Sequence, residues 1–358
     1  MNARVLIMAG GTGGHVYPAL AVAEELRSRG VEVSWLGTRR GLEAEVVPQA
    51  GYPIDWIDTA GLRGKGWRSL LTAPPRLLRA LWQAAGVLRR RRPAVVLGMG
   101  GFVSGAGGLA AWLLRRPLVV HEQNALPGFT NRVLARLARR VLVAFPQAFA
   151  GHPRRLDTGN PLRREFAQVA PPEQRLAGRE GPLRVLVVGG SLGAMVFNQV
   201  LPQALALFDA AARPQVLHQS GRRNLDAARQ AYAQAGVAAR VEPFIEDMPA
   251  AYAWADVVVC RAGALTVAEL AAVGVAAILV PYPHAVDDHQ THNARLLSAA
   301  GAALLLPQDE LTAPRLHRAL VELGERERLQ AMARAAHRLG RPDATRRVAD
   351  ACLEVAHV

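Results

Sequence analysis

Short apolar runs alternate with helical patterns along most of the chain. Val5–Ala9 is an apolar run that breaks into the glycine-rich loop Gly10–Gly14, and apolar residues at helical spacing follow. The next apolar run, Val31–Leu36, completes a strand–helix–strand unit. A similar unit opens much later, where Arg184–Val188 breaks into Gly189–Gly193. Strands that alternate with helices predict parallel sheets covered by helices on both faces.

The same pattern predicts the domain organisation. Further strands are expected at Ala94–Met99, Leu118–His121, Val141–Ala144, Asp256–Cys260 and Ala276–Val280. Asp157–Pro161 has turn residues and no apolar periodicity, so we place a domain boundary there. The chain is therefore predicted to be an α/β protein with two doubly wound, Rossmann-like domains, residues 1–160 and 161–340, that face a cleft. A last helix within residues 341–358 is expected to pack back on the first domain.

Positive charge is concentrated in the first half of the chain. The net charge is +14; residues 1–160 contain 22 basic and 9 acidic residues, and residues 161–358 contain 21 and 20. From Thr59 to His121 there are eleven basic residues and no acidic one. The first half is therefore expected to face nucleic acid, phosphate groups or a membrane surface. The alternative is a general excess of arginine, which supplies 42 of the 43 basic residues.

Composition argues against several other classes of protein. The two cysteines, Cys260 and Cys352, exclude a disulfide scaffold and a CxxC metal site, and they fit a reducing compartment. The apolar run before Gly10 is too short for a signal peptide. Residues 93–114 are uncharged and long enough to span a membrane, but six glycines and a proline favour a strand, a glycine loop and a helix instead.

Three glycine-rich loops are candidates for binding phosphate. They are Gly10–Gly14, Gly98–Gly105 and Gly189–Gly193, and such loops let backbone N–H groups approach an anion at a helix N-terminus. A dinucleotide site is not expected, because Val16 replaces the third glycine of that fingerprint and no acidic residue follows the second strand. The only lysine, Lys65, excludes a Walker A loop. The loops therefore indicate a phosphorylated ligand, with ligand-free tight turns as the alternative.

Six motifs in one order resemble those of a bacterial enzyme family. They are Gly10–His15, His121–Asn124, Thr158–Pro161, Val188–Ser191, Trp254–Arg261 and Ala264–Glu269. The set is similar to the UDP-N-acetylglucosamine:N-acetylmuramyl-(pentapeptide) pyrophosphoryl-undecaprenol N-acetylglucosaminyltransferases. The resemblance implies the two-domain GT-B architecture. It also implies transfer of N-acetylglucosamine to the muramyl C4 hydroxyl of lipid I, with inversion, to give lipid II in peptidoglycan biosynthesis.

The resemblance also assigns the donor site. Glu269 would accept hydrogen bonds from both ribose hydroxyls, and Ile245 would meet uracil through its backbone N–H and C=O, beside Phe244. The helix that starts at Ala264 suits a diphosphate, as does the guanidinium of Arg261. The alternative for Glu269 is an exposed helical carboxylate that binds no ligand. The alternative for Phe244 is a side chain that belongs to the core. The full donor set is Thr12, Gly13, Gly14, Asn124, Arg163, Ser191, Phe244, Ile245, Arg261, Ala264, Leu265, Thr266, Val267, Ala268, Glu269 and Gln290.

We expect neither a metal nor another cofactor. Asp287 and Asp288 are adjacent, but the chain contains no Asp-x-Asp motif, which the metal-dependent glycosyltransferases of the other major fold use. Helix N-termini and arginines would then stabilise the charge of the leaving group. Gln290 matches the family's position for sugar hydroxyls, whereas His289 departs from the glutamine of some members, and its role stays open.

The reaction needs a base that takes the proton from the acceptor hydroxyl. His15 ends the first glycine loop and begins a helix, whose positive end disfavours an imidazolium cation, so its imidazole is a candidate. Two alternatives stay open. His15 could bind the acceptor's pyrophosphate instead, or Glu122 could be the base.

The stretch without acidic residues mixes arginine with large apolar side chains. The residues expected at the acceptor and the membrane are Leu77, Leu78, Leu81, Trp82, Arg89, Arg90, Arg91, Arg92 and Trp112. Such a mixture suits an anionic bilayer; the alternative is a helix buried in the core. The resemblance implies a peripheral enzyme at the cytoplasmic face of the inner membrane. It also implies contacts with other cell-wall synthesis and division proteins.

Two further function classes stay open at this point. One is another GT-B enzyme that uses a UDP-sugar, either a glycolipid glycosyltransferase or a UDP-N-acetylglucosamine epimerase, although an epimerase would not need the basic apolar stretch. The other is a basic nucleic-acid-binding protein. We do not expect nucleic acid as a partner, because the basic region contains Leu and Trp rather than the Tyr and Phe that stack on bases.

Overall fold

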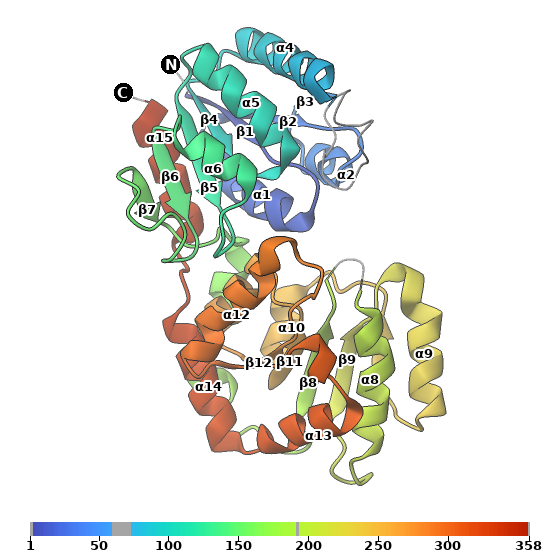
Figure 1. The fold of residues 1–358 in the computed structure, drawn as a ribbon. Helices are drawn as coiled ribbons and strands as arrows, with labels where there is room; N and C mark the ends of the chain where they lie inside the picture. The colour runs from blue at the N-terminus through green and yellow to red at the C-terminus, as the bar shows by residue number, and fades with distance from the viewer. Residues whose placement is uncertain (1–2, 59–72, 191–192, 357–358) are drawn as a thin grey trace. The chain divides into compact units, whose positions relative to one another are not determined.

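The computed structural model describes residues 3–58, 73–190 and 193–356. The chain divides into two compact units, Met1–Arg163 with Asp343–Val358, and Arg164–Pro342. Each unit is an open, fully parallel sheet with helices on both faces (Figure 1). The predicted α/β fold with two doubly wound sheets is confirmed. Ser191 and the Thr59–Thr72 part of the stretch without acidic residues lie outside the described residues.

The sheet of the first unit has the order β3-β2-β1-β4-β5-β6-β7. Its strands are β1 (Arg4–Met8), β2 (Glu32–Gly37), β3 (Ile54–Trp56), β4 (Val95–Gly98), β5 (Leu118–Glu122), β6 (Arg140–Val143) and β7 (Arg155–Asp157). The strand order reverses between β1 and β4, which pair in parallel. In sheets of this kind, ligands bind beyond the carboxyl ends of the strands at the reversal.

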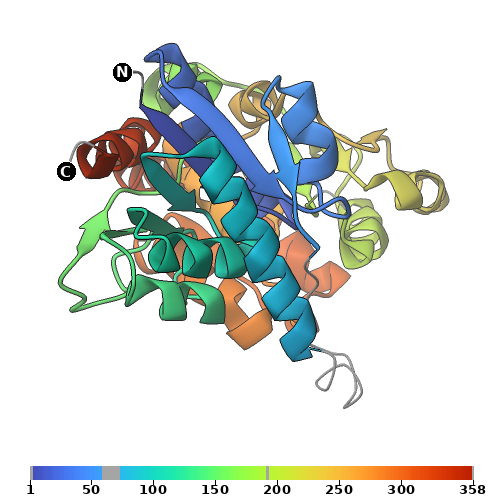
Figure 2. The ribbon, with the colours of Figure 1, turned by 90° about the horizontal axis from the view of Figure 1, so that it is seen from above.

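Helices cover both faces of this sheet (Figure 2). They are α1 (Gly13–Ser28), α2 (Glu43–Gln49), α4 (Ala73–Arg91), α5 (Gly101–Leu113), α6 (Phe129–Ala135) and α15 (Ala344–Ala356). Val5 and Ile7 of β1 pack in the core with α1, α2 and α15. Leu6 and Met8 point the other way, into the core with α4, α5 and α6. The alternation of side chains along a strand thus gives the unit its two cores.

The end of the chain returns to the first unit. Thr345 Oγ1 accepts a hydrogen bond from the backbone N–H of Leu162 over 3.0 Å and donates to the carbonyl of Leu162 over 2.8 Å. Val348, Cys352 and Val355 of α15 then pack in the core beside α1. The last helix therefore belongs to the unit that contains β1.

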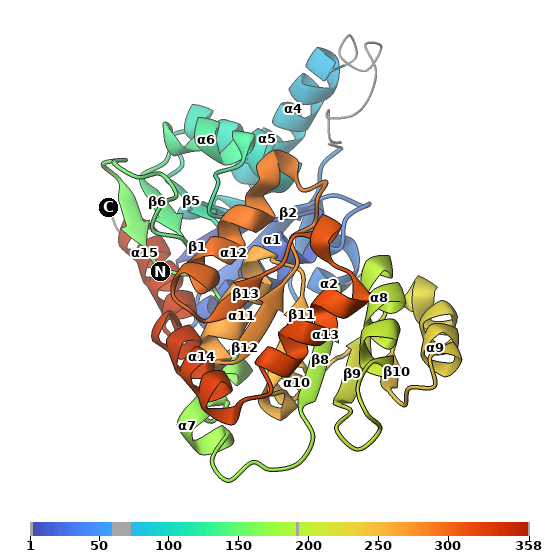
Figure 3. The ribbon, with the colours of Figure 1, turned by 60° about the horizontal axis from the view of Figure 1, so that its bottom comes forward.

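The second unit has a six-stranded sheet in the order β10-β9-β8-β11-β12-β13 (Figure 3). Its strands are β8 (Arg184–Val188), β9 (Gln215–Gln219), β10 (Arg240–Glu242), β11 (Val257–Cys260), β12 (Ala276–Leu279) and β13 (Ala303–Leu305). Its helices are α7 (Pro172–Arg175), α8 (Met195–Ala206), α9 (Leu225–Gln234), α10 (Met248–Trp254), α11 (Ala264–Val273), α12 (His289–Ala299), α13 (Ala313–Glu322) and α14 (Arg326–Arg338). The order reverses between β8 and β11.

The uncharged stretch 93–114 folds as the sequence predicts. It contains β4, a glycine loop and α5. Among the described residues, no helix is both long enough and apolar enough to cross a membrane.

Candidate functional site

The loops after β1 and β4 pack against each other at the carboxyl edge of the first sheet. The N–H of Met99 donates to the carbonyl of Met8 over 2.8 Å. A Cβ atom on Gly101 would lie 2.5 Å from the carbonyl oxygen of Gly10, and Gly101 has a φ of 81°. Only glycine allows this approach. Close packing therefore explains part of the glycine content that the sequence associates with phosphate.

Glu43 already occupies part of the first glycine loop. Its buried carboxylate accepts hydrogen bonds from Gly11 N at 2.9 Å and from Thr38 N and Oγ1 at 3.0 and 2.8 Å. The N–H of Gly11 is therefore not available to an anion, which corrects the expectation that the whole loop would be. The N–H groups of Gly13 and Gly14 begin α1, where a helix leaves its N–H groups without intrahelical partners.

His15 lies in the first turn of α1, and residues that follow β4 and β5 hold its ring. Its Nδ1 lies 3.2 Å from Oε1 of Gln123. The Nε2 of Gln123 in turn donates to the Met99 carbonyl over 2.7 Å. The other ring nitrogen of His15, Nε2, has no hydrogen-bond partner in the part of the chain that the structure describes. One of the two candidate bases thus has a ring that is held at Nδ1 and a second nitrogen, Nε2, without a hydrogen-bond partner in the described chain.

Glu122, the other candidate base, is buried and supports a loop. Its carboxylate accepts hydrogen bonds from Asn124 N at 3.0 Å, Gly128 N at 3.1 Å and Asn131 Nδ2 at 2.9 Å. These donors bring the start of α6 to the end of β5. Because donors already surround both oxygens, the arrangement favours a structural role for Glu122 over proton abstraction.

The motif at the domain boundary supports the same loop. His121 is fully buried, and its Nε2 lies 3.0 Å from the carbonyl oxygen of Gly159. Burial lowers the pKa of His121 to about 4, so the ring is neutral and Nε2–H donates to that carbonyl. Asn160 Nδ2 donates to the carbonyl of Gln123 over 3.2 Å. The Thr158–Pro161 motif is therefore a framework for the loop that contacts His15.

In the second unit, Glu269 lies in the second turn of α11 and is half-buried. The hydroxyl of Tyr252 on α10 donates to its Oε2 over 3.0 Å. Burial raises the pKa of Tyr252 well above its usual value, and the charge of Glu269 adds to the rise. Tyr252 is therefore a permanent donor that orients the carboxylate. Sequence reasoning missed it, because no spacing links it to Glu269.

Gln219 holds the residue expected to meet uracil. Its Oε1 accepts from the N–H of Ile245 over 3.1 Å, and its Nε2 donates to the Gly190 carbonyl over 2.9 Å. Of the two backbone groups of Ile245 expected at the base, the N–H already has a partner and the carbonyl remains. Phe244 and Ile245 line a groove of about 680 Å³ beside β9 and β10.

Arg261 is used inside the second unit. Its guanidinium donates to the carbonyls of Val280 and Pro281 at 3.2 and 3.1 Å and to Gln308 Oε1 at 2.6 Å. It also lies over the rings of Phe197 and Tyr282. These contacts tie the ends of β11 and β12 together and hold the guanidinium of Arg261 in place. The expected contact of Arg261 with the diphosphate stays a prediction.

Gln290 clamps the same edge of the sheet. Its Oε1 accepts from Ala262 N at 3.2 Å and Tyr282 N at 2.9 Å. Asp287 and Asp288 precede it with φ angles of 54° and 50°, and Asp288 accepts a hydrogen bond from Thr291. Among the described residues, no cluster of three or more His, Cys, Asp or Glu side chains could hold a metal ion.

The remaining donor candidates lie at the two carboxyl edges. In the first unit, Thr12 is exposed at the start of α1, Asn124 is half-buried after β5, and Arg163 is exposed at the unit's end. In the second, α11 begins at Ala264 after Gly263. Its first residues are Ala264, Leu265, Thr266, Val267 and Ala268. The structure thus groups the candidates by unit at the edges where parallel sheets bind ligands.

Two family models match the two halves of the chain. The N-terminal domain model of glycosyltransferase family 28 matches residues 5–143, and its C-terminal domain model matches residues 184–348. The chain belongs to glycosyltransferase family 28.

Relatives of known name resemble this family 28 chain over its full length. The proteins from Marinobacter nauticus and Alkalilimnicola ehrlichii are 59% and 60% identical to it over 99% of the chain and 98% and 100% of their own lengths. Both are UDP-N-acetylglucosamine–N-acetylmuramyl-(pentapeptide) pyrophosphoryl-undecaprenol N-acetylglucosamine transferases. The kinship that the six motifs predict is confirmed.

Solved structures support the same kinship. Acinetobacter baumannii MurG has a TM-score of 0.86 at 41% identity and covers 98% of this chain and 99% of its own. The calicheamicin glycosyltransferase CalG4 has a TM-score of 0.68 at 19% identity, with 100% of this chain and 99% of its own covered, and shows only that the fold is shared.

Exposed apolar side chains of this family 28 chain gather on three neighbouring helices of the first unit. They are Leu77, Leu78 and Trp82 on α4, Phe102, Trp112 and Leu113 on α5, and Phe129 and Val133 on α6, and each is 40–76% exposed. The opposite side of α4 packs Ala80, Ala84 and Leu88 in the core. Leu81 is half-buried against that core, so less of its side chain is exposed than those of Leu77, Leu78 and Trp82. One side of α4 therefore packs in the core, and the other side exposes apolar side chains.

The arginine run at the end of α4 is partly neutralised. Asp55 on β3 pairs with Arg90 at 2.5 Å and with Arg91 at 2.7 Å. The pairing neutralises part of the charge of the run, and the expected contact of these arginines with a membrane stays a prediction. Arg89 and Arg92 have no acidic partner among the described residues.

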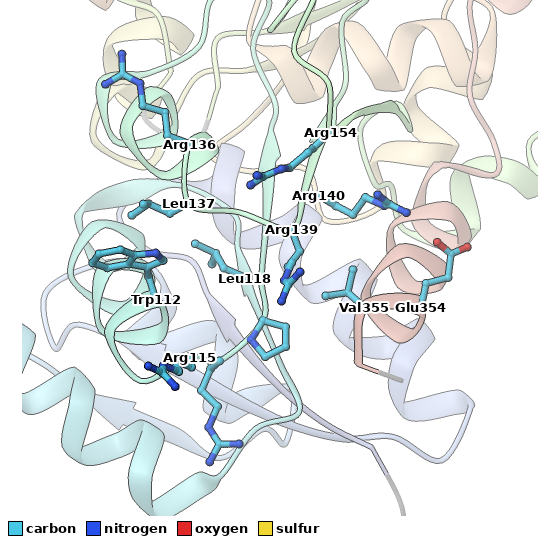
Figure 4. Close-up of a pocket in the computed structure, with 12 residues that line it drawn as sticks. Trp112, Arg115, Leu118, Arg136, Leu137, Arg139, Arg140, Arg154, Glu354 and Val355 are labelled. Carbon is cyan, nitrogen blue, oxygen red and sulfur yellow. The ribbon is translucent and has the colours of Figure 1, made fainter. Parts of the chain in front are cut away.

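A second basic feature was missed by sequence reasoning. A groove of about 890 Å³ lies beside the start of β5 and β6 (Figure 4). His15 lies at the opposite, carboxyl edge of the same parallel sheet. Arginines from separate elements surround it, with Trp112 and Leu137 on its wall. They are Arg115, Arg116, Arg136, Arg139, Arg140 and Arg154. Glu354 is the one acidic residue of the described lining and forms no ion pair within the described chain. The groove thus combines strong positive charge with apolar wall.

Proposed function

We propose that this chain transfers N-acetylglucosamine from UDP-N-acetylglucosamine to the muramyl C4 hydroxyl of lipid I, with inversion, and so makes lipid II for peptidoglycan biosynthesis. The observation that carries the proposal is full-length identity of 59–60% with transferases whose names state this donor and acceptor class. Lipid I is the polyprenyl-pyrophosphate acceptor. No metal or other cofactor takes part in the steps below.

The second unit binds the nucleotide. The carboxylate of Glu269 accepts hydrogen bonds from the two ribose hydroxyls. The hydroxyl of Tyr252 holds this carboxylate in place. The diphosphate meets the N-terminus of α11, where backbone N–H groups favour an anion. The carbonyl of Ile245 meets the base. Arg163, Ser191 and Arg261 remain candidates for the phosphates, and Gln290 for the sugar hydroxyls.

The first unit supplies the base. As the C4 oxygen of the acceptor attacks the anomeric carbon and the bond to UDP breaks, Nε2 of His15 takes the hydroxyl proton. The open Nε2 supports this role, and the occupied carboxylate of Glu122 argues against the alternative. A single displacement of this kind inverts the configuration at the anomeric carbon.

The first unit also contacts the membrane. The exposed side chains of α4, α5 and α6 enter the bilayer interface, and the unpaired arginines, those of the groove included, meet anionic headgroups. The enzyme is peripheral and works on the cytoplasmic face, where lipid I is made available. Other cell-wall synthesis and division proteins are proposed partners.

Release of UDP tests the proposed function against its alternatives. Incubated with UDP-N-acetylglucosamine and a lipid I analogue, the protein should release UDP, and without the analogue it should release almost none. An epimerase would convert the sugar nucleotide without any acceptor. A nucleic-acid-binding protein would be stabilised against heat by oligonucleotides rather than by UDP.

A further inference from the structure

We propose that Gln123 is a positioning residue that sets the tautomer of His15, with hydrogen on Nδ1 and the lone pair on Nε2. The proposal rests on the proposed function, in which His15 is the base. Gln123 does not touch the reacting atoms. It acts by deciding which ring nitrogen can accept a proton.

The amide of Gln123 has one orientation. Its side chain is 1% exposed, and one end lies 2.7 Å from the carbonyl oxygen of Met99. A carbonyl oxygen can only accept, so the NH₂ group must face Met99 and Oε1 must face His15. The backbone around this amide is anchored as well, because Met99 N donates to Met8 and the Gln123 carbonyl accepts from Asn160.

The orientation of the amide determines the proton position on the ring. Oε1 has no hydrogen to give, so the 3.2 Å contact with His15 Nδ1 requires hydrogen on Nδ1. In the uncharged ring, Nε2 then has a free lone pair. The opposite tautomer would set two acceptors against each other inside a buried contact, which costs free energy.

Gly100 fixes the plane of the same ring. A Cβ atom at this position would lie 2.7 Å from both Nδ1 and Cε1 of His15, so the ring packs against bare backbone. The φ of Gly100 is 98°, a conformation that favours glycine. Two residues thus hold the ring of His15. Gly100, which follows β4, packs against it, and Gln123, which follows β5, forms a hydrogen bond with it.

Nitrogen NMR of histidine-labelled full-length protein, above the titration range of the ring, tests the inference without any activity measurement. The His15 signals should show Nδ1 protonated and Nε2 unprotonated in the wild type. In Gln123→Met, which keeps the length and removes the acceptor, the Nε2–H form should become populated. Asn131→Leu, which removes a buried amide on α6 that does not touch His15, is the control and should leave the tautomer unchanged. A wild-type ring with hydrogen on Nε2, or no change in Gln123→Met, would overturn the proposal.

Kinetics separate this inference from the proposed function. Gln123→Met should lower kcat by about tenfold or more, less than loss of the base itself, with donor KM little changed. Gln123→Glu keeps an acceptor for Nδ1–H, and its second oxygen faces the Met99 carbonyl, where a protonated carboxyl group can donate. The variant should therefore keep the Nδ1–H tautomer and recover part of the kcat lost in Gln123→Met. A Gln123→Glu ring with hydrogen on Nε2 would count against positioning. If the NMR result holds but His15→Ala keeps full kcat, the tautomer assignment stands and the role of His15 as base fails.

Discussion

The hydroxyl of Tyr252 donates a hydrogen bond of 3.0 Å to Oε2 of Glu269. This contact turns a half-buried carboxylate on α11 into a preoriented acceptor for a diol. Glu269→Ala should weaken UDP binding about ten- to a hundredfold, because charge-assisted hydrogen bonds contribute roughly 1.5–3 kcal/mol. Tyr252→Phe should weaken it less, about two- to tenfold, because the variant keeps the carboxylate that meets the ribose and removes only the bond that orients it.

Titration calorimetry with UDP measures both effects. Glu327→Ala, an exposed carboxylate on α14 of the same unit, is the control and should bind UDP as the wild type does. A Glu269→Ala affinity within about twofold of the wild type would remove Glu269 from the ribose site.

His15→Ala should lower kcat by roughly 10²–10⁴-fold, as loss of a general base does. UDP affinity should change little, and the acidic limb of the pH profile should disappear, because the group that must be unprotonated is gone. Steady-state kinetics across pH with a short-chain lipid I analogue measures this. If the variant mainly raises the acceptor KM and keeps the limb, His15 binds the acceptor and is not the base.

Glu122→Gln should lower the free energy of unfolding and leave the acidic limb of the pH–activity profile unchanged. The change sets an amide NH₂ against the donors of Asn124, Gly128 or Asn131, and a buried donor left without a partner costs about 1–3 kcal/mol. Urea unfolding should show this loss, and activity per folded molecule should keep its acidic limb. Loss of that limb in Glu122→Gln would restore Glu122 as the candidate base.

Arginines of the groove should matter more for membrane binding than paired ones. Each arginine near an anionic surface contributes about 1 kcal/mol, so changing Arg139 and Arg140 to Gln should weaken binding to anionic vesicles about thirtyfold. The matched change of Arg90 and Arg91 removes the same charge, but Asp55 already neutralises part of it, so the loss should be smaller. Equal losses in vesicle sedimentation would show that only net charge matters.

His121 should make the first unit sensitive to acid. Its pKa is lowered by burial to about 4, against 6.5 when unfolded, so between these values the unfolded chain binds more protons. Stability is therefore lost as pH falls, by about 1 kcal/mol per pH unit. His121→Gln keeps a donor for Gly159 and should flatten this dependence between pH 7 and pH 5 in urea unfolding. An unchanged slope would mean that His121 is not buried as a neutral ring.

The sequence predicts the central strands better than the edges. β1, β4, β5, β8, β11 and β12 are buried on both faces, so each appears as an apolar run next to glycine or turn residues. The strands β3, β7, β10 and β13 have three residues each, and most of those residues are only partly buried. Such short segments give no period that distinguishes them from loops.

The site was predictable as motifs but not as contacts. Family resemblance points to His15 and Glu269, yet their partners Gln123 and Tyr252 lie 108 and 17 positions away. The buried role of Glu43 depends on a contact across 32 positions, and no pattern marks it. The contacts of Arg261 show the same limit. Its chemistry suits phosphate, and no sequence pattern shows that it also donates to two backbone carbonyls.

Transfer of labelled sugar tests the central claim most directly. The protein is incubated with UDP-N-acetylglucosamine that carries label in the sugar and with a lipid I analogue, and the lipid fraction is analysed. We predict a labelled disaccharide lipid joined through the muramyl C4 oxygen with inverted anomeric configuration, and about a hundredfold less of it or lower from His15→Ala at the same protein concentration. An unlabelled lipid fraction from folded, UDP-binding protein, or a product with retained configuration, would contradict the account.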